Sequence, residues 1–131
     1  MDYLLDTHAL LWFTGGDKRL SDKARKIIED TDNNLSVSVA SLFEIAIKVK
    51  IGKMDLKKPL DVVYRDIQTA SINIIPIEPL HLLAYQNIPL HADHRDPFDR
   101  IIVATAMAEN LTIISVDPKF LYYSDLVRIV W

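Results

Sequence analysis

The sequence predicts an α/β fold with a mainly parallel central sheet and helices on both faces of that sheet. Short apolar runs typical of buried strands alternate with segments of helical periodicity along all 131 residues. Parallel strands need long crossover connections, and the helical segments between the apolar runs supply them. Half of the residues are apolar and a quarter are charged, as in ordinary globular chains, so residues 1–131 are expected to form one domain.

The strands are expected at the short apolar runs, because a strand covered on both faces is apolar throughout. In chain order these runs are residues 3–5, 35–39, 74–77, 111–116 and 126–130. Pro76 indicates a strand end in the third run, because proline cannot donate to a central ladder. Asp117 followed by Pro118 ends the fourth run, and the fifth is expected at an edge of the sheet.

The helices are indicated by apolar residues at helical spacing and by signals at their ends. In chain order they are residues 7–13, 22–29, 41–50, 60–72, 80–87 and 97–109. Ser21 or Asp22 can cap the second helix, and Gly52 ends the third. Pro97 opens the last helix, at a position where proline is favoured, and the alanines of this helix permit close packing on the sheet.

The composition excludes several classes of protein. The chain has no cysteine, which excludes disulfides, zinc–thiolate sites and thiol nucleophiles. Its apolar runs are far shorter than the ~20 residues of a spanning helix, and Asp2 and Asp6 interrupt the first of them, so neither a membrane span nor a signal peptide is expected. A cytoplasmic location is therefore expected. The net charge of −3 argues against capture of nucleic acid by overall positive charge, although segregated charges would still permit binding.

Four carboxylates are expected at the edge of the sheet where the strands end. Asp6 directly follows the first strand, and Glu44 lies one turn into the helix after the second. Asp117 directly follows the fourth strand, and Asp99 lies in the first turn of the helix before it. Ligands of parallel sheets bind beyond the carboxyl ends of the strands, so these acids are expected to gather there.

Each acid also has a purely structural interpretation. Asp6 and Asp117 could cap the helices that they precede, Glu44 could complete a capping box that starts at Ser41, and Asp99 fits the same pattern. Capping is the commoner role for a single acid near a helix start. Four acids together, however, repel one another and lose hydration, which a hard divalent cation such as Mg²⁺ or Mn²⁺ would relieve. Without a cation, at least one acid is expected to bind a proton near neutral pH.

Three segments that carry these acids resemble a known family. They are LLDTHALLW at residues 4–12, VSVASLFEIAIK at 37–48 and HRDPFDRII at 94–102. Together with Ser115–Val116–Asp117 they resemble the PIN-domain nucleases and, more narrowly, the VapC-type toxins of bacterial type II toxin–antitoxin pairs. The resemblance covers essentially the whole chain. Ser115 stands where this branch often has threonine, and serine keeps the hydroxyl.

The resemblance implies an endoribonuclease that cleaves RNA phosphodiesters with water activated by Mg²⁺ or Mn²⁺. The acidic quartet of the family, which is catalytic and binds the metal, corresponds to Asp6, Glu44, Asp99 and Asp117. Asp6 and Asp99 are expected as direct ligands, Asp117 as a direct or water-mediated ligand, and Glu44 as the residue that orients water on the metal. The resemblance further implies a cognate antitoxin that blocks the acidic pocket, and a homodimer, for which the first helix offers apolar residues.

Further polar residues are expected around the quartet. Thr7 and Ser115 could orient carboxylates or waters, or could simply cap helices. Asp96 is expected first as the cap of the helix 97–109 and second as an outer acid beside Asp99.

Cationic residues flank the expected pocket as well. Lys48 lies four residues after Glu44, the favourable order for an ion pair, although it could instead reach a substrate phosphate. His94, Arg95 and Arg100 could contact phosphate, although hydrogen bonding within the loop is the commoner role of such a histidine.

Lysines and aromatic residues give weaker indications about RNA. Five lysines fall within a short segment, where they form either a solvated face or a rim that follows phosphates: Lys48, Lys50, Lys53, Lys57 and Lys58. Trp12 and Phe13 of the first helix are expected to pack or to form an interface, and Phe98 is expected in the core. Stacking platforms for single-stranded RNA are not evident in the sequence.

Other classes of protein share this architecture. A phosphoacceptor signalling domain would need an adjacent acidic pair after the first strand and a lysine after a late strand. A phosphatase of the haloacid-dehalogenase type would need a second aspartate where His8 stands. A catalytically silent PIN-like binding module is the remaining alternative, against which the intact quartet argues.

Overall fold

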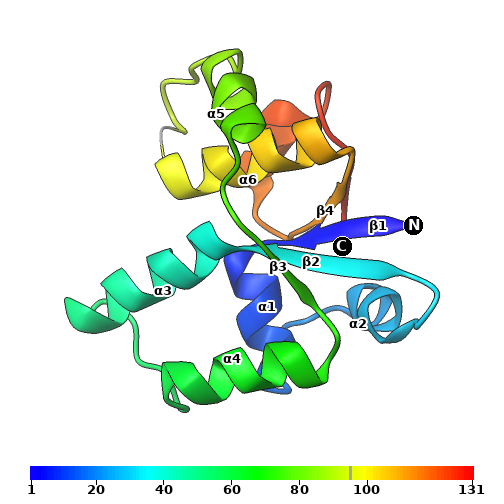
Figure 1. The fold of residues 1–131 in the computed structure, drawn as a ribbon, viewed down its shortest axis with the longest axis vertical. Coiled ribbons are helices and arrows are strands. Elements are labelled where there is room, and N and C mark those ends of the chain that lie inside the picture. The colour runs from blue at the N-terminus through cyan, green and yellow to red at the C-terminus, as the bar shows by residue number, and fades with distance from the viewer. Residues whose placement is uncertain (95) are drawn as a thin grey trace.

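The computed structural model describes residues 1–94 and 96–131. A parallel sheet of five strands lies at its centre, and helices cover both faces of the sheet (Figure 1). The strands lie in the order β3-β2-β1-β4-β5, and each neighbouring pair is parallel. Their bounds are Asp2–Leu5 (β1), Asn34–Ser38 (β2), Asn73–Ile75 (β3), Thr112–Ile114 (β4) and Ile129–Val130 (β5). The predicted fold class is therefore confirmed.

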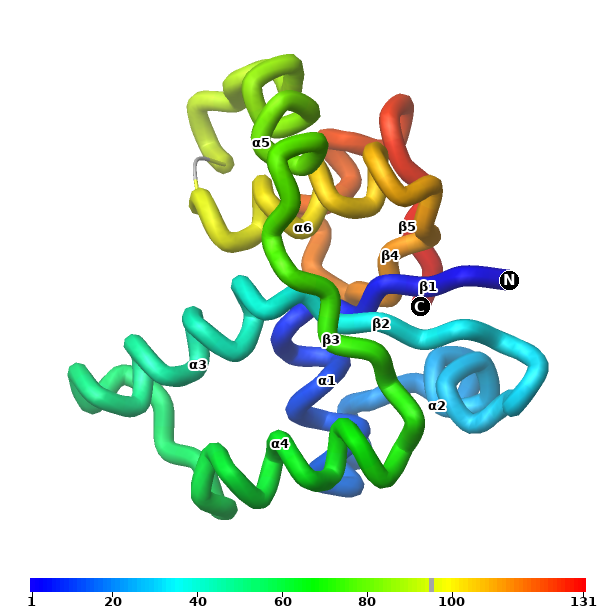
Figure 2. Tube along the Cα trace, viewed as in Figure 1, coloured from blue at the N-terminus to red at the C-terminus, as the bar shows by residue number. Residues whose placement is uncertain are grey.

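The helices form two layers. Their bounds are Thr7–Thr14 (α1), Asp22–Glu29 (α2), Val39–Lys50 (α3), Leu60–Thr69 (α4), Pro79–Gln86 (α5) and Pro97–Glu109 (α6), with a 3₁₀ helix at Pro118–Tyr123 (η1). Helices α1, α2 and α4 cover one face of the sheet, and α5, α6 and η1 cover the other. Helix α3 leaves the end of β2 and contacts both α1 and α6 (Figure 2). Among the described residues, no helix has the length and apolar character to cross a membrane.

The central strand β1 contributes side chains to the hydrophobic cores on both faces of the sheet. Successive side chains of a strand point to opposite faces, so Leu4 and Leu5 enter different cores. Leu5 packs in the core that includes Leu10 of α1 and Ile67 of α4. Leu4 packs in the core that includes Ile102 of α6. Both leucines are fully buried, and burial of one leucine side chain contributes about 1.5–3 kcal/mol.

Two of the predicted strands are too long at their ends. The fourth strand ends at Ile114, because the chain turns at Ser115, whose hydroxyl accepts a hydrogen bond from the N–H of Asp117. The last strand begins only at Ile129, because the N–H groups of Leu126 and Val127 donate to Tyr123 and continue the turn of η1. The helix η1 itself was not predicted.

Two predicted helices also have wrong bounds. Helix α3 begins at Val39, because the side chain of Ser38 accepts from the N–H of Ala40, so the capping box predicted at Ser41 does not form. Helix α4 ends at Thr69, and Ser71 follows with a left-handed φ of 58°. The other elements agree with the prediction within one or two residues.

The strand order brings three carboxyl ends together. Because β1 lies between β2 and β4, the residues that follow these three strands meet at one edge of the sheet. The N–H of Asp6 continues this register by donating to the carbonyl of Ile114 at 3.2 Å. This edge therefore places the starts of α1, α3 and η1 next to one another.

Candidate active site

Asp6 is a buried carboxylate that caps α1. Only 4% of the residue is exposed. Its Oδ1 accepts from the N–H of Ala9 at 2.7 Å, and its Oδ2 accepts from the Ser115 hydroxyl at 2.5 Å. Burial raises the pKa of Asp6 from 3.8 to about 6, the charge of Asp99 raises it further, and the two hydrogen bonds oppose this shift. This value lies about one unit below neutral pH, and loss of hydration, rather than repulsion between the acids, is its largest cause.

Ser115 links Asp6 to Asp117. The Ser115 hydroxyl donates to Asp6 and accepts from the N–H of Asp117 at 3.0 Å. Asp117 is half-buried, and its Oδ1 accepts from the N–H of Lys119 at 3.0 Å. Asp117 thus caps η1, and Ser115 contacts a carboxylate as expected for an orienting hydroxyl.

Glu44 is held between α1 and Lys48. Its Oε1 accepts from the Thr7 hydroxyl at 2.7 Å, and its Oε2 lies 3.0 Å from the Lys48 Nζ. The hydrogen bond with Glu44 raises the pKa of Lys48, and the charges of Asp96 and Asp99 raise it further. The predicted ion pair is therefore present, and Lys48 lies in the field of the acids on α6.

Asp99 is oriented by a buried histidine. The Nε2 of His94 lies 3.0 Å from Asp99 Oδ2, and its Nδ1 lies 2.7 Å from the hydroxyl of Tyr123. Burial raises the pKa of Asp99, the charges of Asp96 and Glu44 also raise it, and the hydrogen bond with His94 lowers it. Because His94 is 1% exposed, it is placed to orient Asp99 rather than to meet a substrate phosphate.

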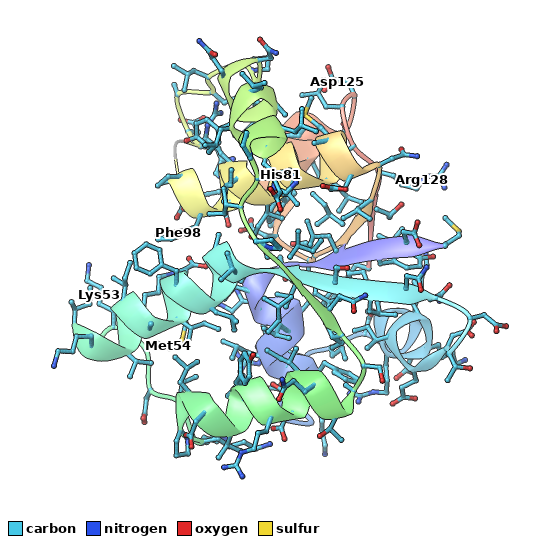
Figure 3. All side chains as sticks on the ribbon, viewed as in Figure 1. Lys53, Met54, His81, Phe98, Asp125 and Arg128 are labelled. Atoms are coloured by element: carbon cyan, nitrogen blue, oxygen red, sulfur yellow. The ribbon has the colours of Figure 1, made fainter. Side chains whose placement is uncertain are left out.

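Asp96 caps α6, as predicted. Its Oδ1 accepts from the N–H groups of Phe98 at 2.8 Å and Asp99 at 3.3 Å. Phe98 is half-buried and lies edge-on to Phe43 of α3, with ring centroids 5.9 Å apart (Figure 3). This contact joins α3 to the start of α6 near the acids.

The acids are linked to one another by charge or through a shared hydroxyl. The charge of Asp99 acts on Asp6, and that of Glu44 acts on Asp99, whereas Asp117 is joined to Asp6 through Ser115. No three His, Cys, Asp or Glu side chains within residues 1–94 and 96–131 lie close enough to hold one metal ion. The gathering of all four acids around one ion therefore stays a prediction, and in this structure each carboxylate is engaged by its own local partners.

The donor chemistry nevertheless fits a hard divalent cation. Mg²⁺ is commonly bound in proteins by one or two carboxylates, with waters and substrate phosphates as its other ligands. Asp6 and Asp99 supply two such carboxylates, and burial, the main cause of their raised pKa values, leaves the ionised forms poorly hydrated.

Arg100 does not have the surface position that a substrate contact requires. It is 3% exposed, and its guanidinium donates to the carbonyls of Pro89 at 3.0 Å and Ile88 at 3.1 Å. It also lies over the ring of Tyr85, 5.1 Å from its centroid. Arg100 therefore holds the loop after α5, and the predicted contact with substrate is not supported. Arg95 lies outside the described residues.

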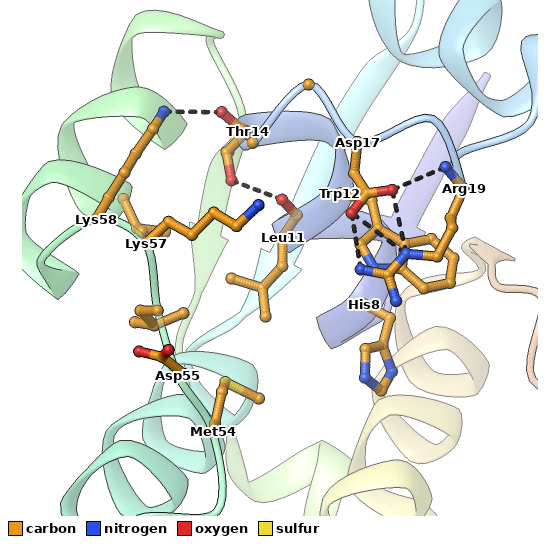
Figure 4. Close-up of a pocket in the computed structure, with 14 residues that line it drawn as sticks. His8, Leu11, Trp12, Thr14, Asp17, Arg19, Met54, Asp55, Lys57 and Lys58 are labelled. Carbon is orange, nitrogen blue, oxygen red and sulfur yellow. Dashed lines mark hydrogen bonds and ion pairs between the residues drawn. The ribbon is translucent and has the colours of Figure 1, made fainter.

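A groove of about 520 Å³ lies beside α1 (Figure 4), and the four acids are not among its lining residues. Its lining includes Lys57 and Lys58, two of the five lysines that could form a rim following RNA phosphates. The Lys58 Nζ donates to the carbonyl of Thr14 at 3.0 Å and pairs with Asp66 at 2.9 Å. The lysine run is therefore divided, because Lys48 contacts Glu44 while Lys57 and Lys58 belong to this groove.

Comparisons with known proteins agree with the fold. The family model described as "PIN domain" matches residues 3–126, and no curated protein matches the sequence significantly. VapBC2 from Rickettsia felis, solved with a DNA fragment from its promoter, is 18% identical with a TM-score of 0.71, covering 100% of this chain and 99% of that chain. FitAcB from Neisseria gonorrhoeae is 19% identical with a TM-score of 0.64, covering 100% and 97%. A toxin–antitoxin complex from Klebsiella pneumoniae is 20% identical with a TM-score of 0.62, covering 98% and 96%.

Proposed function

The chain belongs to the PIN-domain family, and from this premise we propose that it is a metal-dependent endoribonuclease, the toxin of a type II toxin–antitoxin pair. The observation that carries the proposal is the pair Asp6 and Asp99. Asp6 follows β1 at the edge where β1, β2 and β4 end, and Asp99 in the first turn of α6 lies near enough for its charge to act on Asp6. Burial raises the pKa of both carboxylates. Ionised acids in such a place favour a bound cation.

Mg²⁺ or Mn²⁺ is the proposed cofactor. Asp6 and Asp99 would hold the ion directly, Asp117 directly or through water, and Glu44 would orient the attacking water. When bound, the ion would lower the pKa of a water molecule and neutralise charge on the phosphate oxygens.

The surrounding side chains hold the carboxylates in fixed orientations. Ser115 and the N–H of Ala9 engage the two oxygens of Asp6, so that this side chain cannot rotate freely. Thr7 fixes Glu44, and His94 fixes Asp99. Such outer contacts raise the precision of a metal or catalytic site, because its groups need no rearrangement on binding.

Lys48 is the proposed cationic contact to the substrate. It neutralises Glu44, and its side chain remains 38% exposed. A positive charge beside the acids would attract a phosphate that the acids alone repel.

A cleavage assay tests this function. Wild-type protein is expected to cleave an RNA oligonucleotide in the presence of Mg²⁺, and cleavage is expected to stop when a chelator is added. Asp99→Asn keeps the shape of the side chain but removes a charged ligand, so the cleavage rate is expected to fall by about 10²-fold or more. Asp125→Asn, at an exposed acid on the loop after η1, is the control and should cleave normally. Cleavage that survives both the chelator and Asp99→Asn contradicts the proposal.

We also propose an antitoxin and a second copy of the chain as partners. The similarity to solved structures of toxin–antitoxin complexes supports the first. The apolar surface that would support a homodimer lies on α5, where Leu80, Leu82 and Leu83 are 66%, 56% and 59% exposed. The first helix, which was expected to offer this surface, instead packs Trp12 and Phe13 partly against the core. Light scattering should then give a mass twice that of one chain.

A further inference from the structure

Four aromatic rings form a cluster beside the acids. His91 and Tyr122 are stacked, with ring centroids 5.1 Å apart and an interplanar angle of 17°. His94 also stacks on Tyr122, at 6.4 Å and 27°, and Tyr123 lies against both histidines at 5.3 Å. The cluster joins the turn at residues 91–94 to the helix η1.

The cluster has a buried pair and an outer pair. Tyr123 and His94 are buried, whereas Tyr122 is 43% exposed and His91 is half-buried. The N–H of His94 donates to the carbonyl of His91 at 3.0 Å, which closes the turn and fixes the position of the His91 ring. The outer rings thus pack on the two buried rings, and Tyr122 keeps much of its surface exposed.

The outer pair is connected to two of the acids through its neighbours. The Nε2 of His94 lies 3.0 Å from Asp99, and the ring of the same histidine stacks on Tyr122. On the other side, η1 starts at its cap Asp117 and carries Tyr122. The outer rings are therefore linked through packed neighbours to the segments that carry Asp99 and Asp117.

We propose that His91 and Tyr122 form a platform on which an unpaired base of the RNA substrate stacks, next to the phosphate that meets the acids. This inference rests on the proposed nuclease function. Sequence-specific proteins commonly bind single-stranded RNA by stacking its bases on aromatic side chains. A chain with a net charge of −3 and an acidic site gains little affinity from overall charge, so stacking supplies attraction that does not depend on charge.

Binding to a catalytically inactive protein tests the platform. The probe is a fluorescein-labelled, unstructured RNA oligonucleotide, and Asp6→Asn is the background in which all variants are made, because it leaves the ring cluster intact. Tyr122→Ala is expected to weaken binding about tenfold, the effect of losing one stacked base, while Tyr122→Phe keeps the ring and should bind within about twofold of the background. Tyr64→Ala is the matched control, because Tyr64 of α4 is a tyrosine of similar exposure, 45%, on the other layer.

Oligonucleotides with one abasic position each show whether a base is the partner. In the Asp6→Asn background, removing the base at one position should weaken binding by a factor similar to that of Tyr122→Ala. Adding Tyr122→Ala should then weaken binding of that abasic oligonucleotide no further. Tyr122→Leu keeps apolar volume without the ring and should bind as weakly as Tyr122→Ala. Circular dichroism of both variants shows whether they are folded.

Three results would overturn the platform. They are equal affinities of Tyr122→Ala and the background, binding of Tyr122→Phe as weak as that of Tyr122→Ala, and equal affinity for every abasic oligonucleotide. If RNA cleavage that depends on Asp99 is observed together with any of these three results, the stacking platform is refuted while the proposed nuclease function is retained. If no RNA is bound or cleaved, both fail.

Discussion

Replacing Asp6 by asparagine is expected to stabilise the folded protein at pH 7 while removing the proposed RNA cleavage. Burial raises the pKa of Asp6 to about 6, from an ordinary value of 3.8, so the ionised form is unfavourable in the folded state. Asparagine has nearly the same shape, stays neutral, and can still accept from the N–H of Ala9. At pH 7 the gain should approach about 3 kcal/mol, the free energy equivalent of two pKa units.

The free energy of unfolding of wild-type protein should therefore depend on pH. The folded state binds the proton of Asp6 more tightly than the unfolded state, so the stability of wild-type protein should fall as pH rises from about 4 to about 6. Asp6→Asn should lack this part of the fall, and its advantage should be constant above pH 7. Urea unfolding between pH 4 and 8, without divalent ions, measures both, and Asp125→Asn should behave as wild type in this window. A variant less stable than wild type at pH 7 would refute the burial argument.

Arg100→Met is expected to lower the free energy of unfolding by about 2–4 kcal/mol. Methionine fills much of the volume but cannot donate to the carbonyls of Pro89 and Ile88, which accept from the guanidinium. Unpaired carbonyls in this loop would cost about 1–3 kcal/mol each. Denaturant unfolding measures the loss, and Arg128→Met, at an exposed arginine, is the control (Figure 3). Equal unfolding free energies for Arg100→Met and wild type would show that the guanidinium is dispensable.

The elements with strong local signals could be predicted from the sequence. Helix α6 has the predicted bounds because Pro97 and the cap Asp96 mark its start, and α2 begins after its cap Ser21 as expected. The helix η1 was missed, because a short 3₁₀ turn has no apolar periodicity and depends on Asp117 as its cap and on the packing of Tyr123.

The positions of the acids were predictable, but their partners were not. The ends of β1 and β4 identify Asp6 and Asp117 directly. By contrast, the contacts of Thr7 with Glu44 and of His94 with Asp99 depend on how separate segments pack. Those contacts hold each carboxylate through its own partner.

The burial of Arg100 and the stacking of His91 on Tyr122 were beyond the reach of the sequence for one reason. Arg100 follows Asp99 in sequence, yet its side chain turns into the loop after α5, which only the tertiary packing decides. His91 and Tyr122 belong to distant segments, so their stacking leaves no trace in either local sequence.

Calorimetric titration with Mn²⁺ at pH 7.5, where Asp6 is ionised, tests the proposed metal site most directly. Wild-type protein and Asp125→Asn should show saturable binding and a raised melting temperature, because the ion binds the folded state. Asp99→Asn should lose both effects, and wild type should bind more weakly at pH 5, where Asp6 holds a proton. Absence of saturable binding to wild type, or equal binding to Asp99→Asn, would contradict a cation site formed by Asp6 and Asp99.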